Sequence, residues 1–348
     1  MIKIIGLLAM TIIMLVACRT QGLLQEAATP VARIEADITT PDLHPTPTPP
    51  ALRFVLPTMG AEPVSGWRPP LYPIPWAVSP HDHFYFARPI AANKVNWPLA
   101  DYRYGGIFFR PDIVHTGVDI PDDEGTPVLA AGPGTVVWAG WGLFSGYTEN
   151  EQDPYGQAVA IRHDFGYHDQ PLYTIYAHMK EVDVTLGEWV DTGDQLGLVG
   201  NTGFTTGPHL HFEVRLGKNT FYQTYNPELW MAPPQGWGVL VGRVRNTKLQ
   251  AMRHYEVFVK SWESGEMRMV KTYGGETVNS DPYYNENMVL SDLPAGWYKI
   301  MIDYGYKSMD MDVRIYPGQV TYFTFQGYLG FTTDTPPTPN LKSLTPAP

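Results

Sequence analysis

Short runs of β-branched and aromatic residues, separated by glycine-rich turns, dominate residues 67–234. Runs of this kind, bounded by turn residues, are typical of β-strands. The repeat of about 3.6 residues that marks an amphipathic helix is hard to find anywhere in the chain. The pattern therefore predicts an antiparallel β domain, whose clearest strands cover residues 128–130, 135–138, 158–161, 173–176 and 196–199.

A second group of predicted strands covers residues 237–326. Short alternating strands with regular turns predict a small β-sandwich, so the expected fold class is all-β. Two stretches, 242–244 and 293–298, resemble the carboxypeptidase-regulatory-like, transthyretin-type sandwich. His254 is the one histidine of this segment. Because it has no potential ligand partner nearby, we expect the sandwich to be a spacer or binding module that is dispensable for chemistry.

The first 18 residues have the pattern of an export signal. Ile4 to Val16 is an almost unbroken apolar run, shorter than the roughly 20 residues of a membrane span. The sequence Leu15-Val16-Ala17-Cys18 resembles the lipobox of bacterial lipoproteins, which predicts a signal peptide at residues 1–18 and lipidation of Cys18. The alternative is a plain signal peptide with a chance cysteine. As Cys18 is the only cysteine, the sequence contains no disulfide framework.

Proline and charge add two further constraints. Proline accounts for 33 of the 348 residues, about twice its usual share. The Pro/Thr-rich segments 19–66 and 327–348 predict an extended, disordered linker and tail. The formal net charge is −11 and Lys and Arg are scattered. This distribution argues against a nucleic-acid partner, because phosphate-backbone affinity requires clustered cations.

Two motifs far apart in the chain contain candidate metal ligands. The first is His115-Thr116-Gly117-Val118-Asp119, and the second includes His209-Leu210-His211. Residues i and i+2 of a strand point to one face, so the latter two imidazoles lie side by side. Gly117 allows a bend that brings the ends of the first motif together. With His178, the set satisfies a catalytic zinc site, which needs three protein ligands and an open position.

The order H-x-x-x-D, Tyr-Ala-His and H-x-H, together with its glycine-rich spacers, resembles the LytM/lysostaphin-like zinc metalloendopeptidases over residues 105–228. The resemblance implies a compact antiparallel β fold of the duplicated-hybrid-motif type. It also implies that His115, Asp119 and His211 bind one zinc ion per chain. His178 and His209 would then be the catalytic acid–base pair, and which of them is the general base stays open.

These observations predict a lipid-anchored zinc metalloendopeptidase of the cell envelope. Its expected partners are the stem or bridge peptides of peptidoglycan and, through the lipid, a membrane. One alternative is a non-catalytic scaffold that binds the wall or activates a partner amidase. Another is a secreted zinc peptidase that acts on protein. The complete set of five site residues favours an enzyme.

Four other features have competing interpretations. We expect His81 and His83 to serve packing rather than a second metal site, and His163 and His168 to form hydrogen bonds at strand ends. Glu213 either orients His211 as a hydrogen-bond acceptor or is an exposed strand carboxylate. The segment 141–154 either forms a wall of the substrate site or is an inert insertion.

Overall fold

The structure is a computed structural model that describes residues 70–90, 100–107, 114–332 and 336. Its regular elements are almost all strands, which confirms the all-β class. The predicted signal peptide, Cys18, the linker 19–66 and most of the tail 327–348 lie outside the described residues. Residues 327–332 form a 3-10 helix and a short strand, so the predicted disordered tail begins too early. Within the described ranges, no helix has the length and apolar character needed to cross a membrane. The three short 3-10 helices there are η1 (Ala100–Tyr102), η2 (Pro227–Leu229) and η3 (Gly327–Leu329).

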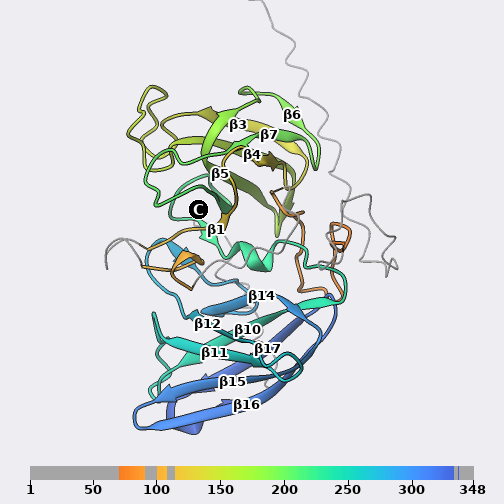
Figure 1. Ribbon diagram of the computed structural model, residues 1–348, viewed down its shortest axis with the longest axis vertical. Coiled ribbons are helices and arrows are strands. Elements are labelled where there is room, and N and C mark those ends of the chain that lie inside the picture. The colour runs from red at the N-terminus through yellow and green to blue at the C-terminus, as the bar shows by residue number, and fades with distance from the viewer. Residues whose placement is uncertain (1–69, 91–99, 108–113, 333–335, 337–348) are drawn as a thin grey trace, which may run out of the picture. The chain divides into compact units, whose positions relative to one another are not determined.

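The larger sheet has ten strands in the described part of the chain, and its central order is β13-β9-β8-β5-β4-β3-β6. Figure 1 shows β3, β4 and β5 of this sheet side by side. All pairs are antiparallel except the β9–β13 pair. The strands are β1 (Val118–Pro121), β2 (Pro127–Leu129), β3 (Gly134–Gly140), β4 (Gln157–Tyr167), β5 (Gln170–Val182), β6 (Trp189–Val190), β7 (Gln195–Val199), β8 (His209–Leu216), β9 (Thr224–Tyr225) and β13 (Val278–Asn279).

Strand β8 carries two kinds of side chain on its two faces, because successive residues of a strand point in opposite directions. The apolar members, Leu210, Phe212, Val214 and Leu216, belong to the main hydrophobic core. The polar members, His209, His211, Glu213 and Arg215, are also buried. A buried polar face on a central strand requires hydrogen-bond partners for every group, so it marks the place to look for a functional site.

Two four-stranded sheets make up the second β region. One has the order β14-β10-β17-β18, and the other has the order β12-β11-β15-β16 (Figure 1). The pair β10–β17 is parallel, and the other pairs in these two sheets are antiparallel. The strands are β10 (Trp237–Arg245), β11 (Glu256–Ser261), β12 (Met267–Lys271), β14 (Met288–Pro294), β15 (Gly296–Tyr304), β16 (Lys307–Ile315), β17 (Val320–Gln326) and β18 (Phe331–Thr332).

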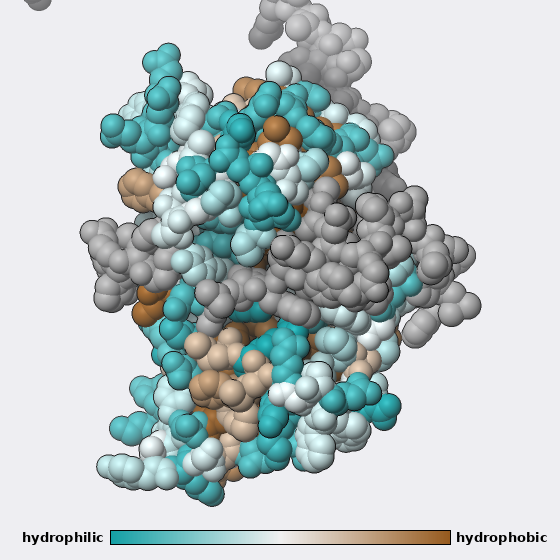
Figure 2. All heavy atoms as spheres, viewed as in Figure 1, coloured by the Kyte–Doolittle hydropathy of each residue, from teal (hydrophilic) through white to brown (hydrophobic). Residues whose placement is uncertain are grey.

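Both regions contribute to one buried cluster. A separate core of the second region includes Leu240, Leu293 and Ile300. Val241 and Val289, however, belong to the same cluster as the apolar side chains of β8. Since buried packing crosses the division, the domain limits 67–234 and 237–326 stay predictions. The face drawn in Figure 2 is mostly polar, with apolar side chains in small groups, as alternating strands with inward apolar residues produce.

Candidate metal centre

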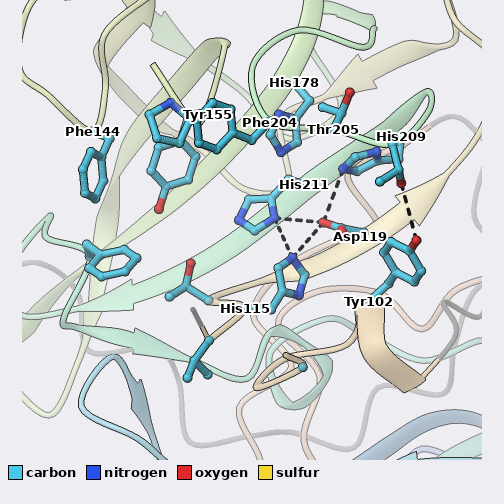
Figure 3. Close-up of a pocket in the computed structure, with 16 residues that line it drawn as sticks. Tyr102, His115, Asp119, Phe144, Tyr155, His178, Phe204, Thr205, His209 and His211 are labelled. Carbon is cyan, nitrogen blue, oxygen red and sulfur yellow. Dashed lines mark hydrogen bonds and ion pairs between the residues drawn. The ribbon is translucent and has the colours of Figure 1, made fainter. Parts of the chain in front are cut away.

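Antiparallel pairing brings the two predicted motifs together. Strand β1 pairs with β8 so that Asp119 lies opposite His211. Strand β5 flanks the other edge of β8, with Ala177 opposite His211, and this register places His178 beside the same site. His115 lies just before β1 and belongs to no strand. The fold thus assembles all five predicted site residues around one end of β8 (Figure 3).

One atom from each of three side chains forms a compact triangle. The distances are 2.9 Å from His115 Nε2 to Asp119 Oδ1, 3.0 Å from His115 Nε2 to His211 Nδ1, and 2.9 Å from His211 Nδ1 to Asp119 Oδ1. Among the described residues, this is the group of histidine and acidic side chains arranged to hold a metal ion. Ligands about 2.0–2.1 Å from a tetrahedral zinc lie roughly 3.3 Å apart, close to these separations.

Hydrogen bonds outside the triangle fix the two ligand imidazoles. His115 Nδ1 lies 3.0 Å from the carbonyl oxygen of Arg103, and His211 Nε2 lies 3.0 Å from Glu213 Oε1. Each contact is with an acceptor, so these nitrogens carry the proton and donate it. The remaining nitrogen of each ring then points a lone pair at the carboxylate of Asp119. Three converging acceptors need a cation between them, and two nitrogens with one carboxylate oxygen suit zinc.

The electrostatics of the triangle favour positive charge there. Burial by itself disfavours the charged form of His211, but hydrogen bonds to Asp119 and Glu213, and the charges of both, outweigh it and raise its pKa to about 9. Burial likewise works against the Asp119 carboxylate, yet the two adjacent histidines hold the pKa of that group well below its usual range. A proton therefore binds strongly where a metal ion would displace it.

Gly117 is required by a close approach of two chain segments. A Cβ added there would lie 2.4 Å from the carbonyl oxygen of Phe212 and 2.9 Å from the His211 ring. Its φ is outside the left-handed region that glycine favours. The bend expected from the sequence is thus less important than the absence of a side chain, which lets the chain between His115 and Asp119 pass against β8.

His178 has an unusual backbone conformation. It lies in β5 with φ of 62°, next to register shifts in the pairing of β5 with β4 and β7. A left-handed conformation at a residue other than glycine costs on the order of 1–3 kcal/mol and clusters at functional sites. Here the kink is held by the bond from His178 N to the carbonyl oxygen of Tyr155, 2.9 Å away. No local pattern of residues predicts this backbone conformation.

His178 and His209 lie beside each other at the cavity, with ring centroids 4.8 Å apart (Figure 3). His178 Nδ1 donates to the carbonyl oxygen of Thr202, and His209 Nδ1 donates to the carbonyl oxygen of Gly207. Both distances are 2.8 Å. His209 Nε2 lies 3.6 Å from Asp119 Oδ1. In both rings, Nε2 is therefore the nitrogen left to act as an acceptor.

Burial keeps this second pair of imidazoles neutral. Burial, reinforced by the neighbouring histidines His211 and His209, lowers the pKa of His178 to about 3. Burial also lowers the pKa of His209. Both rings are therefore neutral at neutral pH, and each has an Nε2 lone pair with which it can accept a proton.

Glu213 is fully buried, which excludes the exposed-carboxylate interpretation. Besides His211, it accepts hydrogen bonds from Thr116 Oγ1, from Tyr155 Oη at 2.6 Å and from Arg215 Nε at 2.7 Å. The Arg215 charge and these bonds outweigh the effect of burial and lower the pKa of Glu213. The carboxylate therefore stays charged and fixes the orientation of the His211 ring.

A cavity of about 690 Å³ opens over the triangle. Its wall includes Phe144 of the segment 141–154, which packs edge to face against Phe221 at 5.5 Å. Buried Asp153 holds that segment by accepting bonds from the backbone of Phe144 and Ser145. Phe144 and Pro154 thus place this segment at the wall of the cavity, and its effect on a substrate stays a prediction. The sequence reasoning missed the lining residues Tyr102, Phe204 and Phe221, because no motif includes them.

Four other histidines make packing or hydrogen-bond contacts away from the triangle. Buried His83 pairs with Asp281 at 3.2 Å, and His81 stacks on Tyr283. His163 bonds with the carbonyl oxygen of Pro133 and with Thr174 Oγ1. His168 lies at the β4–β5 turn with its ring edge-on to Tyr167.

Part of the chain is similar in sequence to known peptidases. Residues 113–223 match the model of Peptidase family M23. DD-carboxypeptidase/endopeptidase Mpg of Neisseria meningitidis serogroup B is 38% identical over 128 residues, 37% of this chain and 26% of that protein. Lysostaphin of Staphylococcus staphylolyticus is 34% identical over 136 residues, 38% of this chain and 25% of that protein. The chain thus matches about a quarter of the length of these relatives.

Solved structures include similar domains. The catalytic domain of the antimicrobial peptidase lysostaphin from Staphylococcus simulans is 28% identical, with a TM-score of 0.31, over 36% of this chain and 86% of that chain. A zinc-containing peptidase from Vibrio cholerae is 25% identical, with a TM-score of 0.28, over 40% of this chain and 38% of that chain.

The hydrogen bond from His211 to Glu213 leads to a prediction about metal affinity. Glu213→Gln keeps the shape of the side chain but removes the charge that holds His211 Nε2–H. We expect Zn²⁺ affinity to fall about tenfold, the lower end of the effect of such outer contacts. Competition with a chelator measures the Zn²⁺ affinity. The control is Glu124→Gln, because Glu124 forms an exposed ion pair with Lys180. Parental affinity in Glu213→Gln would contradict the assigned role.

Proposed function

Because residues 113–223 form a domain of peptidase family M23, we propose that this chain is a zinc-dependent endopeptidase that hydrolyses peptide cross-links of bacterial peptidoglycan. The observation that carries the proposal is the triangle of His115, Asp119 and His211 with two further imidazoles at the same cavity. A binding scaffold has no need of two neutral, oriented imidazoles beside a metal site. The names of the relatives, a DD-carboxypeptidase/endopeptidase and lysostaphin, support a peptide substrate.

In this proposal, His115 Nε2, Asp119 Oδ1 and His211 Nδ1 hold one zinc ion per chain. When bound, zinc polarises a scissile carbonyl and lowers the pKa of a coordinated water toward ~7. The protein contributes the fixed tautomers that aim both ligand nitrogens inward. Their outer partners, the Arg103 carbonyl and Glu213, keep the rings from turning when substrate enters.

His178 and His209 are the proposed acid–base pair. Each has its proton on Nδ1, where a backbone carbonyl holds it, so Nε2 is an acceptor. Either ring can take the proton of the attacking water. Once protonated, its Nε2–H becomes a donor to the oxyanion or to the leaving nitrogen. Burial disfavours positive charge on both rings, which favours passing the proton on to the leaving nitrogen.

The proposed substrate is a stem or bridge peptide of the wall. The aromatic wall of Phe144 and Phe221 on one side, with Tyr102 on the other, gives the cavity flat apolar surfaces that suit an extended peptide. Tyr102 Oη lies 3.4 Å from Thr206 Oγ1 at this cavity. Substrate binding there would place the scissile bond beside both the triangle and the acid–base pair (Figure 3).

Digestion of purified peptidoglycans with different cross-links, followed by mass spectrometry, tests the proposal. We expect the zinc-loaded protein to release fragments from at least one type and to stop when a chelator is added. His211→Ala should lose both the metal and the activity, because it removes a ligand. Elemental analysis that finds one zinc in His211→Ala would overturn the ligand assignment. A zinc-loaded parent that releases no fragment would favour the scaffold or amidase-activator alternative.

His178→Ala and His209→Ala should separate chemistry from metal binding. Neither side chain is part of the triangle, so each variant should retain zinc. Turnover should fall by about 10²–10⁴, the usual contribution of a general acid or base. Zinc content and initial rates on a soluble peptide are the two measurements. Near-parental turnover in either variant would remove that residue from the mechanism.

We also propose that the enzyme is attached to a membrane of the cell envelope through lipid on Cys18. The Pro/Thr-rich segment 19–66 would then let the catalytic domain reach the wall from its anchor, since such sequences favour extended chains. Several acyl chains anchor a protein more firmly than one. The Cys18→Ala substitution should shift the protein from the membrane fraction to the soluble fraction, which cell fractionation would detect. Unchanged membrane association would contradict the lipobox interpretation.

A further inference from the structure

His115 is supported differently from the other two members of the triangle. Asp119 and His211 lie opposite each other on paired strands, so the sheet itself fixes their backbones. His115 precedes β1 and depends on the short segment 103–106. Its Nδ1 and the backbone N of Gly106 both donate to the Arg103 carbonyl oxygen. The backbone N of His115 donates to Gly106 O, and the backbone O of His115 accepts from Gly105 N. Both distances are 2.8 Å.

Tyr273, which follows β12 of the second β region, packs directly against this segment. Its ring meets the Tyr104 ring edge to face, with centroids 5.0 Å apart. A Cβ at Gly105 would lie only 2.0 Å from Tyr273 Cβ, so the two chains touch there without space for a side chain. The backbone N–H of Asn279, in β13, donates to Tyr104 Oη at a distance of 2.7 Å.

A buried ion pair makes a second connection. Arg103 Nη1 donates to both carboxylate oxygens of Glu228 at 2.6 Å, and both side chains are almost fully buried. Glu228 Oε2 in turn accepts from Ser291 N at 2.9 Å and Ser291 Oγ at 2.8 Å, and Ser291 lies on β14. The residue whose carbonyl orients His115 is therefore held through Glu228 by the second β region. Lys271 of β12 adds an ion pair with Asp101, 2.5 Å long.

From these contacts we propose that the second β region is a positioning element of the metal centre, acting through Tyr273 and Ser291 on segment 103–106 and thereby on His115. The inference rests on the proposed function for the identity of the metal. It replaces the expectation that the sandwich is a dispensable spacer. A truncated chain without β12 and β14 would lose the packing that keeps the Arg103 carbonyl under His115 Nδ1.

The test compares matched variants of the full-length protein. Tyr273→Ala removes the ring that packs on Tyr104 and Gly105, and we expect Zn²⁺ affinity to fall about tenfold, as for other outer supports of a ligand. Tyr298→Ala is the control, because Tyr298 is a similarly buried tyrosine in the separate core of the same region. Both variants should unfold at lower denaturant concentration, but Tyr298→Ala should keep parental zinc affinity.

Tyr273→Phe should restore most of the zinc affinity. It keeps the ring and loses only the hydroxyl that donates to Glu286. Parental affinity in folded Tyr273→Ala, or an equal loss in Tyr298→Ala, would overturn the inference. If Tyr273→Ala does not fold, Ser291→Ala decides. It should weaken zinc binding severalfold, and Ser308→Ala, at an exposed position of β16, should not.

Zinc binding and peptidoglycan cleavage by the parent protein distinguish a failure of this inference from a failure of the proposed function. If the parent binds zinc but cuts no peptidoglycan, the proposed activity fails and the affinity comparison still decides the positioning role. If the parent binds no zinc at all, both conclusions fall together. If it binds zinc and cuts the wall while Tyr273→Ala retains parental affinity, the positioning role alone is wrong.

Discussion

The pairing of β1 with β8 is the constraint on which the site depends. It sets Asp119 opposite His211 and brings the chain before β1 against the same end of β8. A one-residue slip of this register would turn Asp119 to the opposite face of its strand and separate the carboxylate from both imidazoles. The buried apolar side chains Val118 and Ile120 of β1 oppose such a slip, because it would turn them away from the core and bury polar groups without partners. Packing on one face of β8 thus secures chemistry on the other.

The four imidazoles of the site are held in the same way. Each has one nitrogen hydrogen-bonded to an acceptor outside the cavity: a backbone carbonyl in three rings and the Glu213 carboxylate in His211. The second nitrogen of each ring then faces the site, and its surroundings distinguish two pairs of histidines. His115 and His211 face the Asp119 carboxylate closely, which suits metal binding. His178 and His209 face the cavity, which suits proton transfer.

Such a site is costly to bury, and the surrounding contacts offset that cost. A buried charge is tolerated only when it is paired and hydrogen-bonded. Glu213 meets Arg215, and Arg103 meets Glu228, so no charge at these positions is left without a counter-ion. The second pair also connects the two β regions through Ser291. Stability of the fold and alignment of His115 consequently depend on the same buried contacts.

The sequence by itself determined the elements and the set of site residues. Alternating and β-branched runs predicted strands at 135–138, 158–161 and 173–176, which lie within β3, β4 and β5. These properties are local, since strand propensity and side-chain alternation act over a few residues. The motifs supplied the candidate ligands, the family resemblance selected His115, Asp119 and His211 among them, and the structure brings these three together as a potential metal site. Tertiary structure decided the rest. The left-handed backbone of His178, the close approach at Gly117 and the support of His115 by Tyr273 all involve segments far apart in the chain. Their geometry is set by packing, and no local pattern of residues records it.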